Sequence, residues 1–531
     1  MGQKTKGVLA AAAILAVAGL LSRLLGFGRN ALLAYFYGAG DILDAYFLAF
    51  RLPDFVFNLL FFGAFSAGFV PVFIKLKNEN KESAWELASD ILNITLVIFI
   101  IFGAVFFVIA PWVLRLIAPG FDQEKMALAV TLSRIMFLQP IFLGVSMIFS
   151  GILQSNHRFL SYSLAPIFYN IGIILGILFL TPKFGPAGLA WGVILGALLH
   201  MLVQYPAAKA SGFNYKPVFS LKKNSLKRIF KVIAPRSASL ILGQLSLVVM
   251  AGLASFLGSG RVAIFNFAND LNSLILGVIA IPLAVAVFPI FSQEVSKDRF
   301  KEFGEMVIRT LRQLLFLIIP ATALFFILRA QIVRLTLGYG KFDWVDTVLT
   351  VQTLGLFLIG LVFQGVLTIV MRAFFALEDA KTTFWVSIVG ILIGLATAFV
   401  LAPVMDVSAL ALGMSVTAVF NTLVLIFILN SRIKSINILA LVGPVSTFIF
   451  GSVAAALGTY GALNFLDRFL NTHKVLHLII QSGLAGLFGV AIYILISIIF
   501  NNTEAKELLS KCGLSRFSSL PDTLDSEIPR S

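Results

Sequence analysis

The stretch "GVLAAAAILAVAGLLSRLLGFGR" (residues 7–29) decides the fold class, because it is long and apolar enough to cross a bilayer as a helix. It also holds two permanent charges, Arg23 and Arg29, which are costly inside a membrane. Comparable apolar runs recur along the whole 531-residue chain, which is 59% hydrophobic and 12% charged. Because these runs lack the apolar–polar alternation of a membrane barrel, we predict an all-α polytopic membrane protein.

About fourteen transmembrane helices are expected. They lie near residues 8–36, 42–76, 84–111, 126–155, 159–181, 186–208, 228–257, 262–293, 306–328, 347–376, 382–404, 407–430, 437–461 and 473–500. With the N-terminus in the cytoplasm, about 26 Lys and Arg residues fall on the cytoplasmic side and about 9 outside, which satisfies the positive-inside rule. An even number of spans then places the C-terminus in the cytoplasm as well.

The two halves of the chain resemble each other. Three pairs of segments match: "FVPVFIKLKNE" (69–79) with "VFPIFSQEVSK" (287–297), "VLRLIAPGFD" (113–122) with "IVRLTLGYGKFD" (332–343), and "AGLAWGVILG" (187–196) with "SALALGMSVT" (408–417). Because each copy has an even number of spans, both keep the same orientation, which is the parallel-repeat plan of several transporters. We therefore expect two six-helix lobes around a central cavity, with two extra C-terminal helices.

The predicted domain boundaries follow from this repeat. They are 1–212 (first lobe, spans 1–6), 213–231 (cytoplasmic amphipathic linker), 232–432 (second lobe, spans 7–12), 433–500 (spans 13 and 14) and 501–531 (polar cytoplasmic tail). Within the linker, "FSLKKNSLKRIFKVIAP" (219–235) combines basic residues with an apolar stripe at helical spacing. It is either a helix lying on the cytoplasmic membrane surface or an ordinary basic loop.

Two arginines in the first span are the first candidate functional residues. Arg23 and Arg29 either face a water-filled cavity or extend to the outer interface, and the intervening Gly26 and Gly28 permit a bend that turns both toward one cavity. An unbroken helix would instead point them in different directions, because six residues rotate a helix by about 240°.

The second span adds a further group of charges. Asp44, Arg51 and Asp54 lie there, and Arg51 and Asp54 are close enough along a helix to pair. Polar residues in spans seven and eight complete the predicted substrate-binding set: Arg23, Arg29, Asp44, Arg51, Asp54, Asn58, Arg236, Asn269 and Asp270. The first lobe is thus cationic, with local counter-ions, and is suited to an anionic ligand.

Several functions are excluded by what the sequence lacks. There is no phosphate-binding glycine loop, no nucleophile elbow and no metal-ligand spacing, so we expect no enzyme activity, no cofactor and no metal site. The net charge of +15 follows from basic membrane loops, so we expect no nucleic-acid partner. A single cysteine, Cys512, rules out disulfides within the chain.

Several motifs together resemble the MurJ/MviN family of lipid II flippases, within the multidrug/oligosaccharidyl-lipid/polysaccharide exporter superfamily. They are "SRLLGFGR" (22–29), "GAGDILDA" (38–45), "GAFSAGFVPVF" (63–73), "APGF" (118–121), "YGKF" (339–342) and "ALEDAKT" (376–382). The resemblance covers roughly residues 1–500. It implies export of an undecaprenyl-diphosphate-linked glycan across the inner membrane of a bacterium, by a monomer that otherwise contacts membrane lipids.

The family's functional positions fall on Arg23, Arg29, Asp44 and Arg51, and the diphosphate is the anion that the cationic lobe would hold. The chain departs from the family at Phe57, Asn58 and Phe62, where many relatives carry Arg-Arg and then Glu, and at Asp270, where many carry an arginine. Positions that some relatives use for sodium fall near Met250, Gly394 and Thr397. These departures predict a site with fewer arginines and give no support for sodium coupling.

Three alternative functions stay open at this stage. The chain could export another polyprenyl-linked glycan, or act as a cation-coupled multidrug-type antiporter, although an antiporter should have an acidic cavity. It could also bind a lipid-linked precursor without transporting it. Such a protein would need no duplicated lobes, so the repeat favours a transporter.

Overall fold

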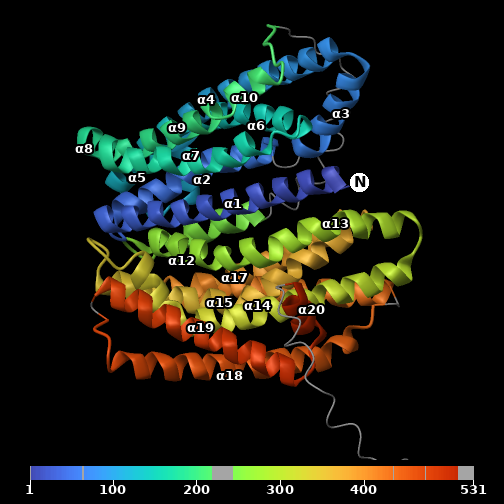
Figure 1. Ribbon diagram of the computed structural model, residues 1–531. Helices are drawn as coiled ribbons and strands as arrows, with labels where there is room; N and C mark the ends of the chain where they lie inside the picture. Colours follow the sequence, from blue (N-terminus) through green and yellow to red (C-terminus); the bar gives the residue numbers. More distant parts are fainter. Residues whose placement is uncertain (1, 62–64, 218–242, 434–435, 473, 512–531) are drawn as a thin grey trace, which may run out of the picture. The chain divides into compact units, whose positions relative to one another are not determined.

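The computed structural model describes residues 2–61, 65–217, 243–433, 436–472 and 474–511, and these are helical almost throughout (Figure 1). Within the described chain, 11 helices are long and apolar enough to cross a membrane. They are Lys81–Ile117, Gln123–Ser155, Phe159–Phe184, Ala187–Ala210, Arg261–Ser296, Phe300–Thr336, Trp344–Ala376, Ala380–Met405, Ser408–Arg432, Ile438–Asp467 and Val475–Ile499. The predicted all-α membrane fold is confirmed.

The other three predicted spans also contain helices. The first coincides with α1 (Gly2–Tyr37) and the second with α2 (Asp41–Phe61) and α3 (Phe65–Glu79). The seventh contains the apolar helix Gly243–Ala254. The basic segment 219–235, for which a surface helix or a loop was expected, and the candidate site residue Arg236 lie outside the described residues.

The remaining helices follow in chain order. They are α4 (Lys81–Ile117), α5 (Gln123–Met136), α6 (Gln139–Ser155), α7 (Phe159–Leu175), η1 (Gly176–Leu180), α8 (Thr181–Phe184), α9 (Ala187–Leu202), α10 (Tyr205–Ala210), α12 (Arg261–Ile275), η2 (Leu276–Ala280), α13 (Ile281–Ser296), α14 (Phe300–Thr336), α15 (Trp344–Ala376), α16 (Ala380–Met405), α17 (Ser408–Arg432), η3 (Ile438–Leu441), α18 (Val442–Asp467), α19 (Val475–Ile499) and α20 (Thr503–Lys511). Two of the long helices begin at side-chain caps, since Asn80 accepts from the N–H of Glu82 and Asp122 from that of Lys125.

The helix boundaries reproduce the offset seen in the sequence. The pairs α2/α12, α4/α14, α5/α15, α7/α16 and α9/α17 begin at 41/261, 81/300, 123/344, 159/380 and 187/408, so the differences are 220, 219, 221, 221 and 221 residues. In addition, α4 and α14 both contain 37 residues. Helix positions therefore repeat with the same period as the sequence.

Small residues let paired helices approach closely in both copies. A Cβ added to Gly172 of α7 would lie 2.3 Å from the Cα of Gly196 in α9, so these backbones are in direct contact. In the second copy, a Cβ on Gly394 of α16 would lie 2.5 Å from the carbonyl oxygen of Gly413 in α17. Any larger side chain at these positions would separate the helices.

The chain divides into two compact units. Unit 1 comprises Met1–Phe267, Thr336–Thr353 and Leu395–Leu410; unit 2 comprises Ala268–Leu335, Leu354–Gly394 and Ala411–Ser531. Unit 1 therefore contains the first repeat together with some helix ends of the second repeat. In unit 2, α18 and α19 lie side by side (Figure 1).

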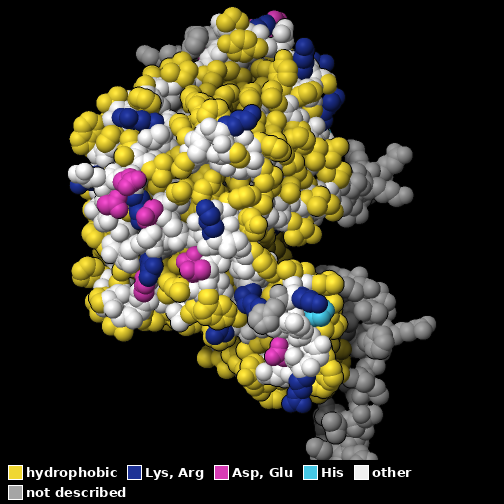
Figure 2. All heavy atoms as spheres, turned by 90° about the vertical axis from the view of Figure 1, so that its left-hand side faces the viewer, with side chains coloured by type: hydrophobic (Ala, Val, Ile, Leu, Met, Phe, Trp, Pro, Cys, Tyr) yellow, Lys and Arg dark blue, Asp and Glu magenta, His cyan; other side chains and the backbone are white. Residues whose placement is uncertain are grey.

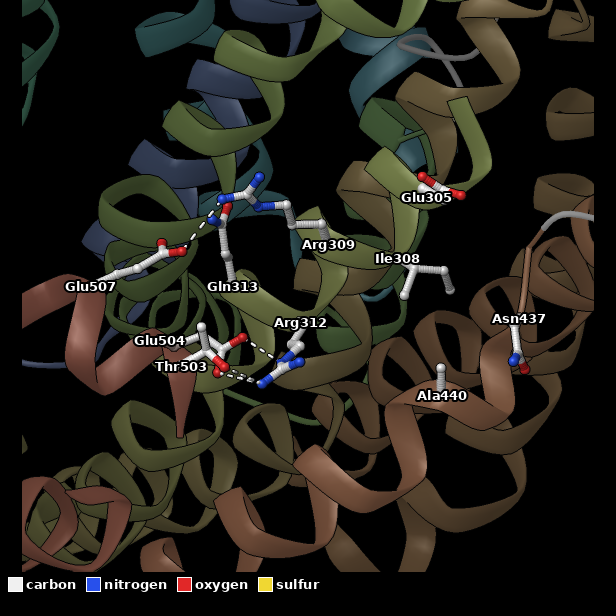
Figure 3. Close-up of a pocket in the computed structure, with 10 residues that line it drawn as sticks. All are labelled: Glu305, Ile308, Arg309, Arg312, Gln313, Asn437, Ala440, Thr503, Glu504 and Glu507. Atoms are coloured by element: carbon white, nitrogen blue, oxygen red, sulfur yellow. Dashed lines mark hydrogen bonds and ion pairs between the residues drawn. The ribbon is translucent and has the colours of Figure 1, made fainter. Parts of the chain in front are cut away.

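Part of the predicted polar tail is folded. Helix α20 packs on α14: Arg312 pairs with Glu504 and also donates to Thr503 at 3.2 Å (Figure 3). Ala505 is 2% exposed, so this short helix is held by an apolar contact as well as by charges. Residues 512–531 lie outside the described chain.

Candidate functional site

Arg29 is held by neutral amides. Its Nε and Nη2 donate to Oδ1 of Asn30 at 3.2 and 3.0 Å, and its Nη1 donates to Oδ1 of Asn170 on α7 at 3.3 Å. Within the described ranges, no carboxylate lies within ion-pair distance of this guanidinium. The guanidinium is therefore ordered while its positive charge is not neutralised by a direct partner.

Tyr169 on α7 marks the place where α1, α2 and α7 converge. It lies within electrostatic range of Arg29 on α1 and of Asp54 and Tyr46 on α2. Because three helices meet there, Arg29 and the charges of α2 belong to one neighbourhood. The structure thus brings the candidate residues Arg29 of the first span and Asp54 of the second within electrostatic range of the same tyrosine.

Three polar side chains of α2, those of Arg51, Asp54 and Asn58, follow one another along the helix and interact. Arg51 donates to Oδ1 of Asn266 on α12. Asp54 lies within electrostatic range of Arg51 and accepts from Nδ2 of Asn58 at 3.3 Å. The polar groups of this series therefore link α2 to α12 within unit 1.

The other candidates occupy different positions. Arg23 lies on α1, and that helix continues without interruption through Gly26 and Gly28. Since six residues correspond to about 240° of rotation, Arg23 and Arg29 leave the helix in different directions. Asn269 and Asp270 are partly exposed residues of α12 and belong to unit 2.

Asp44 is completely buried and caps a distant helix. Its carboxylate accepts from the backbone N–H groups of Gly260 at 2.7 Å and Ala263 at 2.9 Å, and from Nζ of Lys125 at 3.1 Å. Helix α12 begins at Arg261, so these N–H groups are among those that a helix leaves unbonded at its N-terminus. Asp44 thus acts as an N-cap supplied by another helix, next to the positive end of the helix dipole.

Lys125 completes this buried cluster and reveals a charge inversion between the repeats. It pairs with both Asp41 and Asp44 and is 8% exposed. At the repeat offset, Asp41 corresponds to Arg261 and Lys125 to Asp346, and Arg261 lies within electrostatic range of Asp346. Each repeat therefore places one acidic and one basic residue at equivalent positions, with the signs exchanged.

Glycines allow the backbones to meet at this end of unit 1. Gly260 has φ +80°, and a Cβ there would lie 2.1 Å from the carbonyl oxygen of Ala39. Gly340 has φ +71°, and a Cβ there would lie 2.3 Å from the carbonyl oxygen of Tyr35. Side chains are therefore excluded by both space and backbone conformation. The segments "GAGD", "GSGR" and "YGKF" converge here.

Two further interactions connect helix ends of the two repeats. Arg261 binds the carboxylate of Asp406 through Nε and Nη2, at distances from 2.9 to 3.3 Å. Asp346 accepts from the N–H of Ala39 at 2.9 Å.

Figure 2 looks onto the end of the molecule where α1 finishes, and acidic and basic side chains gather there in mixed patches on a largely hydrophobic surface. We call the cluster of Asp41, Asp44, Lys125, Arg261, Asp346 and Asp406 the closed end.

Sequence reasoning missed Lys125, Asn30 and Asn170. Asn30 and Asn170 are single amides within apolar spans, and nothing local distinguishes them from amides that bond to their own helix. Lys125 had a usable signal, because the repeat offset aligns it with Asp346 and both begin a span. Comparing the charges of aligned positions would have drawn attention to this pair.

A pocket in unit 2 has arginines of a different kind. It has a volume of about 420 Å³ and lies between α14, α20 and the segment that precedes α18 (Figure 3). Arg309 lies 3.4 Å from Glu507 and Arg312 pairs with Glu504, while Glu305 adds a further acid. Because its arginines are already paired with glutamates, this pocket offers no excess positive charge to an anion.

The fold is that of a class of multi-pass membrane transporters. One solved structure, described as "Inward-facing conformation of a multidrug resistance MATE family transporter of the MOP superfamily", matches with a TM-score of 0.65 at 16% identity, covering 80% of this chain and 98% of that one. Another, described as "Lipid II flippase MurJ, inward closed conformation", matches with a TM-score of 0.75 at 23% identity, covering 94% of this chain and all of that one.

Sequence comparison identifies the family. Residues 33–482 match the family described as lipid II flippase MurJ. The chain is 30% identical over 431 residues to a lipid II flippase MurJ of Burkholderia cenocepacia, covering 79% of this chain and 84% of that protein. It is 26% identical over 497 residues to a probable lipid II flippase MurJ of Thermotoga maritima, covering 92% and 96%. The chain belongs to the lipid II flippase MurJ family, a family of multi-pass membrane transporters and not of enzymes.

Proposed function

We propose that this chain moves lipid II from the cytoplasmic to the outer leaflet by alternating access, and that Arg29, supported by Arg51, binds the diphosphate of the lipid. The observation that carries the proposal is the state of Arg29. It is an arginine within a membrane helix whose direct partners are the neutral amides of Asn30 and Asn170. An Arg that keeps its charge in a low-dielectric region attracts phosphate strongly and can bind it bidentately.

The closed end supports the transport part of the proposal. A carrier with alternating access must seal one end of its path and later open it. Here the seal consists of hydrogen bonds and ion pairs between helix ends, such as Asp44 with Gly260 and Arg261 with Asp406. Such contacts can be exchanged for water when the end opens, so we propose that this end faces outward and separates during transport.

The proposed topology is the one predicted from basic loop residues, with both termini in the cytoplasm. The proposed arrangement has lobes at 1–212 and 232–432 around a central cavity, joined by the linker 213–231. Residues 433–500 form the added helix pair, and the protein works as a monomer. In this topology the segments of the closed end lie outside the membrane, which agrees with the proposed gate.

Two departures from the family pattern make the identity of the glycan worth testing. The family resemblance implies an arginine at the position of Asp270 and an Arg-Arg pair at the positions of Phe57 and Asn58, so this chain has fewer cationic residues at those positions. Asn58 instead donates to Asp54. A related carrier of another polyprenyl-diphosphate glycan is therefore the second candidate.

The test is complementation in bacteria depleted of their own lipid II flippase. We expect the wild-type chain to restore growth and to prevent accumulation of lipid II in the cytoplasmic leaflet. Arg29→Ala should abolish flipping at normal membrane abundance, and Arg29→Lys should keep only part of it, because Lys binds phosphate as a point charge. No rescue by a well-expressed wild-type chain, with export of a different polyprenyl-diphosphate glycan, would support the second candidate. Full flipping by Arg29→Ala would exclude Arg29 from the site.

A further inference from the structure

The two amides that hold Arg29 have a role of their own. We propose that Asn30 and Asn170 are positioning residues, which fix the guanidinium of Arg29 for a diphosphate and, because they are neutral, leave its positive charge available. This inference rests on the function proposed above. It assigns to the amides no contact with the substrate; they act through Arg29.

Asn30 fixes one edge of the guanidinium. Its single Oδ1 accepts from both Nε and Nη2 of Arg29, at 3.2 and 3.0 Å, and the residue is 5% exposed. Two donors that converge on one acceptor determine the plane of a rigid guanidinium. Since Asn30 follows Arg29 directly on α1, this contact is independent of the neighbouring helices.

Asn170 holds the other side and connects it to α7. Its Oδ1 accepts from Nη1 of Arg29 at 3.3 Å, while its Nδ2 donates to the carbonyls of Pro166 at 3.1 Å and Ser22 at 3.2 Å. Because the neighbours of Nδ2 are acceptors, Oδ1 must face the arginine. The same amide thus orients Arg29 and joins α7 to α1.

The donor count leaves room for a phosphate. A guanidinium has five N–H groups, and three of them are used by the two amides. One N–H remains on each terminal nitrogen, Nη1 and Nη2. Two N–H groups on neighbouring nitrogens are the arrangement with which Arg binds a phosphate bidentately. The amides therefore order the side chain without occupying both of its terminal nitrogens completely.

The neutrality of the partners matters as much as their geometry. A carboxylate in place of Asn30 or Asn170 would hold Arg29 equally well. It would also form an ion pair with Arg29, and this ion pair would compete with the one that Arg29 must form with the phosphate. The pocket beside α20 illustrates that alternative, since Arg312 is paired with Glu504 there. Asn and Asp have the same shape, so the choice between amide and carboxylate can be tested with little steric change.

The decisive variant is Asn30→Asp, studied in the purified full-length protein. We expect its affinity for lipid II to fall about tenfold or more, since a charge-assisted bond to the phosphate is lost. We expect its melting temperature to be retained, because the new carboxylate pairs with Arg29. In an Arg29→Ala background the same substitution should lower the melting temperature, because a buried carboxylate then lacks this partner. A merely structural Asn30 would show the same change in melting temperature in both backgrounds.

The chain offers a matched control. Oδ1 of Asn156 also accepts from a cation, Nζ of Lys77, within unit 1. Asn156→Asp makes the same chemical change beside a different cation, and we expect unchanged lipid II affinity and flipping. Asn170→Ala removes one of the two partners and should weaken binding about threefold or more, because one hydrogen bond to Arg29 is lost.

The outcomes separate this inference from the proposed function. If Arg29→Ala loses binding but Asn30→Asp binds and flips lipid II as the wild type does, the positioning role is wrong and the diphosphate site stands. If Arg29→Ala itself binds normally, the proposed site is wrong. Loss of affinity in Asn156→Asp as large as in Asn30→Asp would also overturn the inference, because the effect would then not depend on Arg29.

Discussion

Asp44 accepts a hydrogen bond from the backbone N–H of Ala263 at 2.9 Å, although 219 residues separate them. The bond joins the second helix of the first repeat to the corresponding helix of the second repeat. Together with the N–H of Gly260 and Nζ of Lys125, it gives a fully buried carboxylate three donors. The side chain of Asp44 therefore caps the N-terminus of α12 and also connects the two repeats within unit 1.

Asp44→Ala should destabilise the protein strongly. It leaves two N–H groups of α12 and one side of Lys125 without their acceptor, and breaking a buried pair of this kind costs about 3–5 kcal/mol. Asp44→Asn should cost less, because one acceptor oxygen remains. Thermal unfolding of the purified protein measures both. Equal melting temperatures for the wild type and Asp44→Ala would show that the buried carboxylate does not hold these helix ends together.

The pair of Arg261 and Asp406 should be recoverable by exchanging its charges. Arg261→Glu opposes two carboxylates and should weaken the closed end, whereas Arg261→Glu combined with Asp406→Arg restores an attractive pair. Both side chains are partly exposed, at 27% and 32%, so we expect a loss of only about 1 kcal/mol from Arg261→Ala. Reaction of a cysteine placed at Ser255, which is only 4% exposed, with a membrane-impermeant thiol reagent reports opening. A double variant as reactive as Arg261→Glu would contradict the proposed gate contact.

The loop between α15 and α16 should contribute a pH-dependent term to stability. Partial burial works to raise the pKa of Asp379, but hydrogen bonds from Thr382 and the charge of Arg432 outweigh it and hold that pKa below its usual value. A depressed folded-state pKa stabilises the fold above the unfolded pKa of about 3.9, and this stabilisation is lost as the pH falls through the folded value.

Asp379→Asn should therefore lower the melting temperature at pH 7, and the difference from the wild type should shrink toward pH 3. Melting curves across this range test the expectation. A constant difference between the two proteins at every pH would mean that the charge of Asp379 has no part in it.

The helix α20 provides a comparison of two neighbouring ion pairs. Arg312 is 32% exposed and pairs with Glu504, which is 10% exposed, whereas Arg309 is 71% exposed and lies 3.4 Å from Glu507. We expect Arg312→Ala to destabilise unit 2 by about 1 kcal/mol and Arg309→Ala to have almost no effect, because water screens the exposed pair. Limited proteolysis after Asn502, compared between the two variants, shows whether α20 is released. Equal protection in both variants would leave the apolar contact of Ala505 as its main anchor.

Much of the fold could be predicted because the bilayer imposes it locally. A spanning helix must satisfy all of its backbone bonds within itself and must be apolar over a fixed length, so each span can be recognised from its own residues. The steady offset between the halves then predicted the repeat of helix boundaries. Helix α20 was missed because six of its nine residues are polar, and its packing depends on Arg312 of a distant helix.

The candidate site was predictable in part. Arg29 was identified by the cost of a charge in an apolar span, and the structure gives it amide partners that hydropathy does not reveal. Asp44 was assigned to the substrate together with its neighbours on α2, whereas the structure places its carboxylate on the N–H groups of α12. A charge that bonds to backbone cannot be recognised from residue types, because every residue except proline offers the same N–H.

By itself, the sequence determined that this protein is a duplicated helical membrane protein with a cationic first half, since hydrophobic length, repeat offset and charge counts are properties of the chain alone. Only the tertiary structure decided which charges are neutralised. Arg29 meets Asn170 across 141 residues, Arg261 meets Asp406 across 145, and Asp44 meets α12 across more than 200. Electrostatic interactions depend on distance and on the dielectric around them, and packing alone sets both.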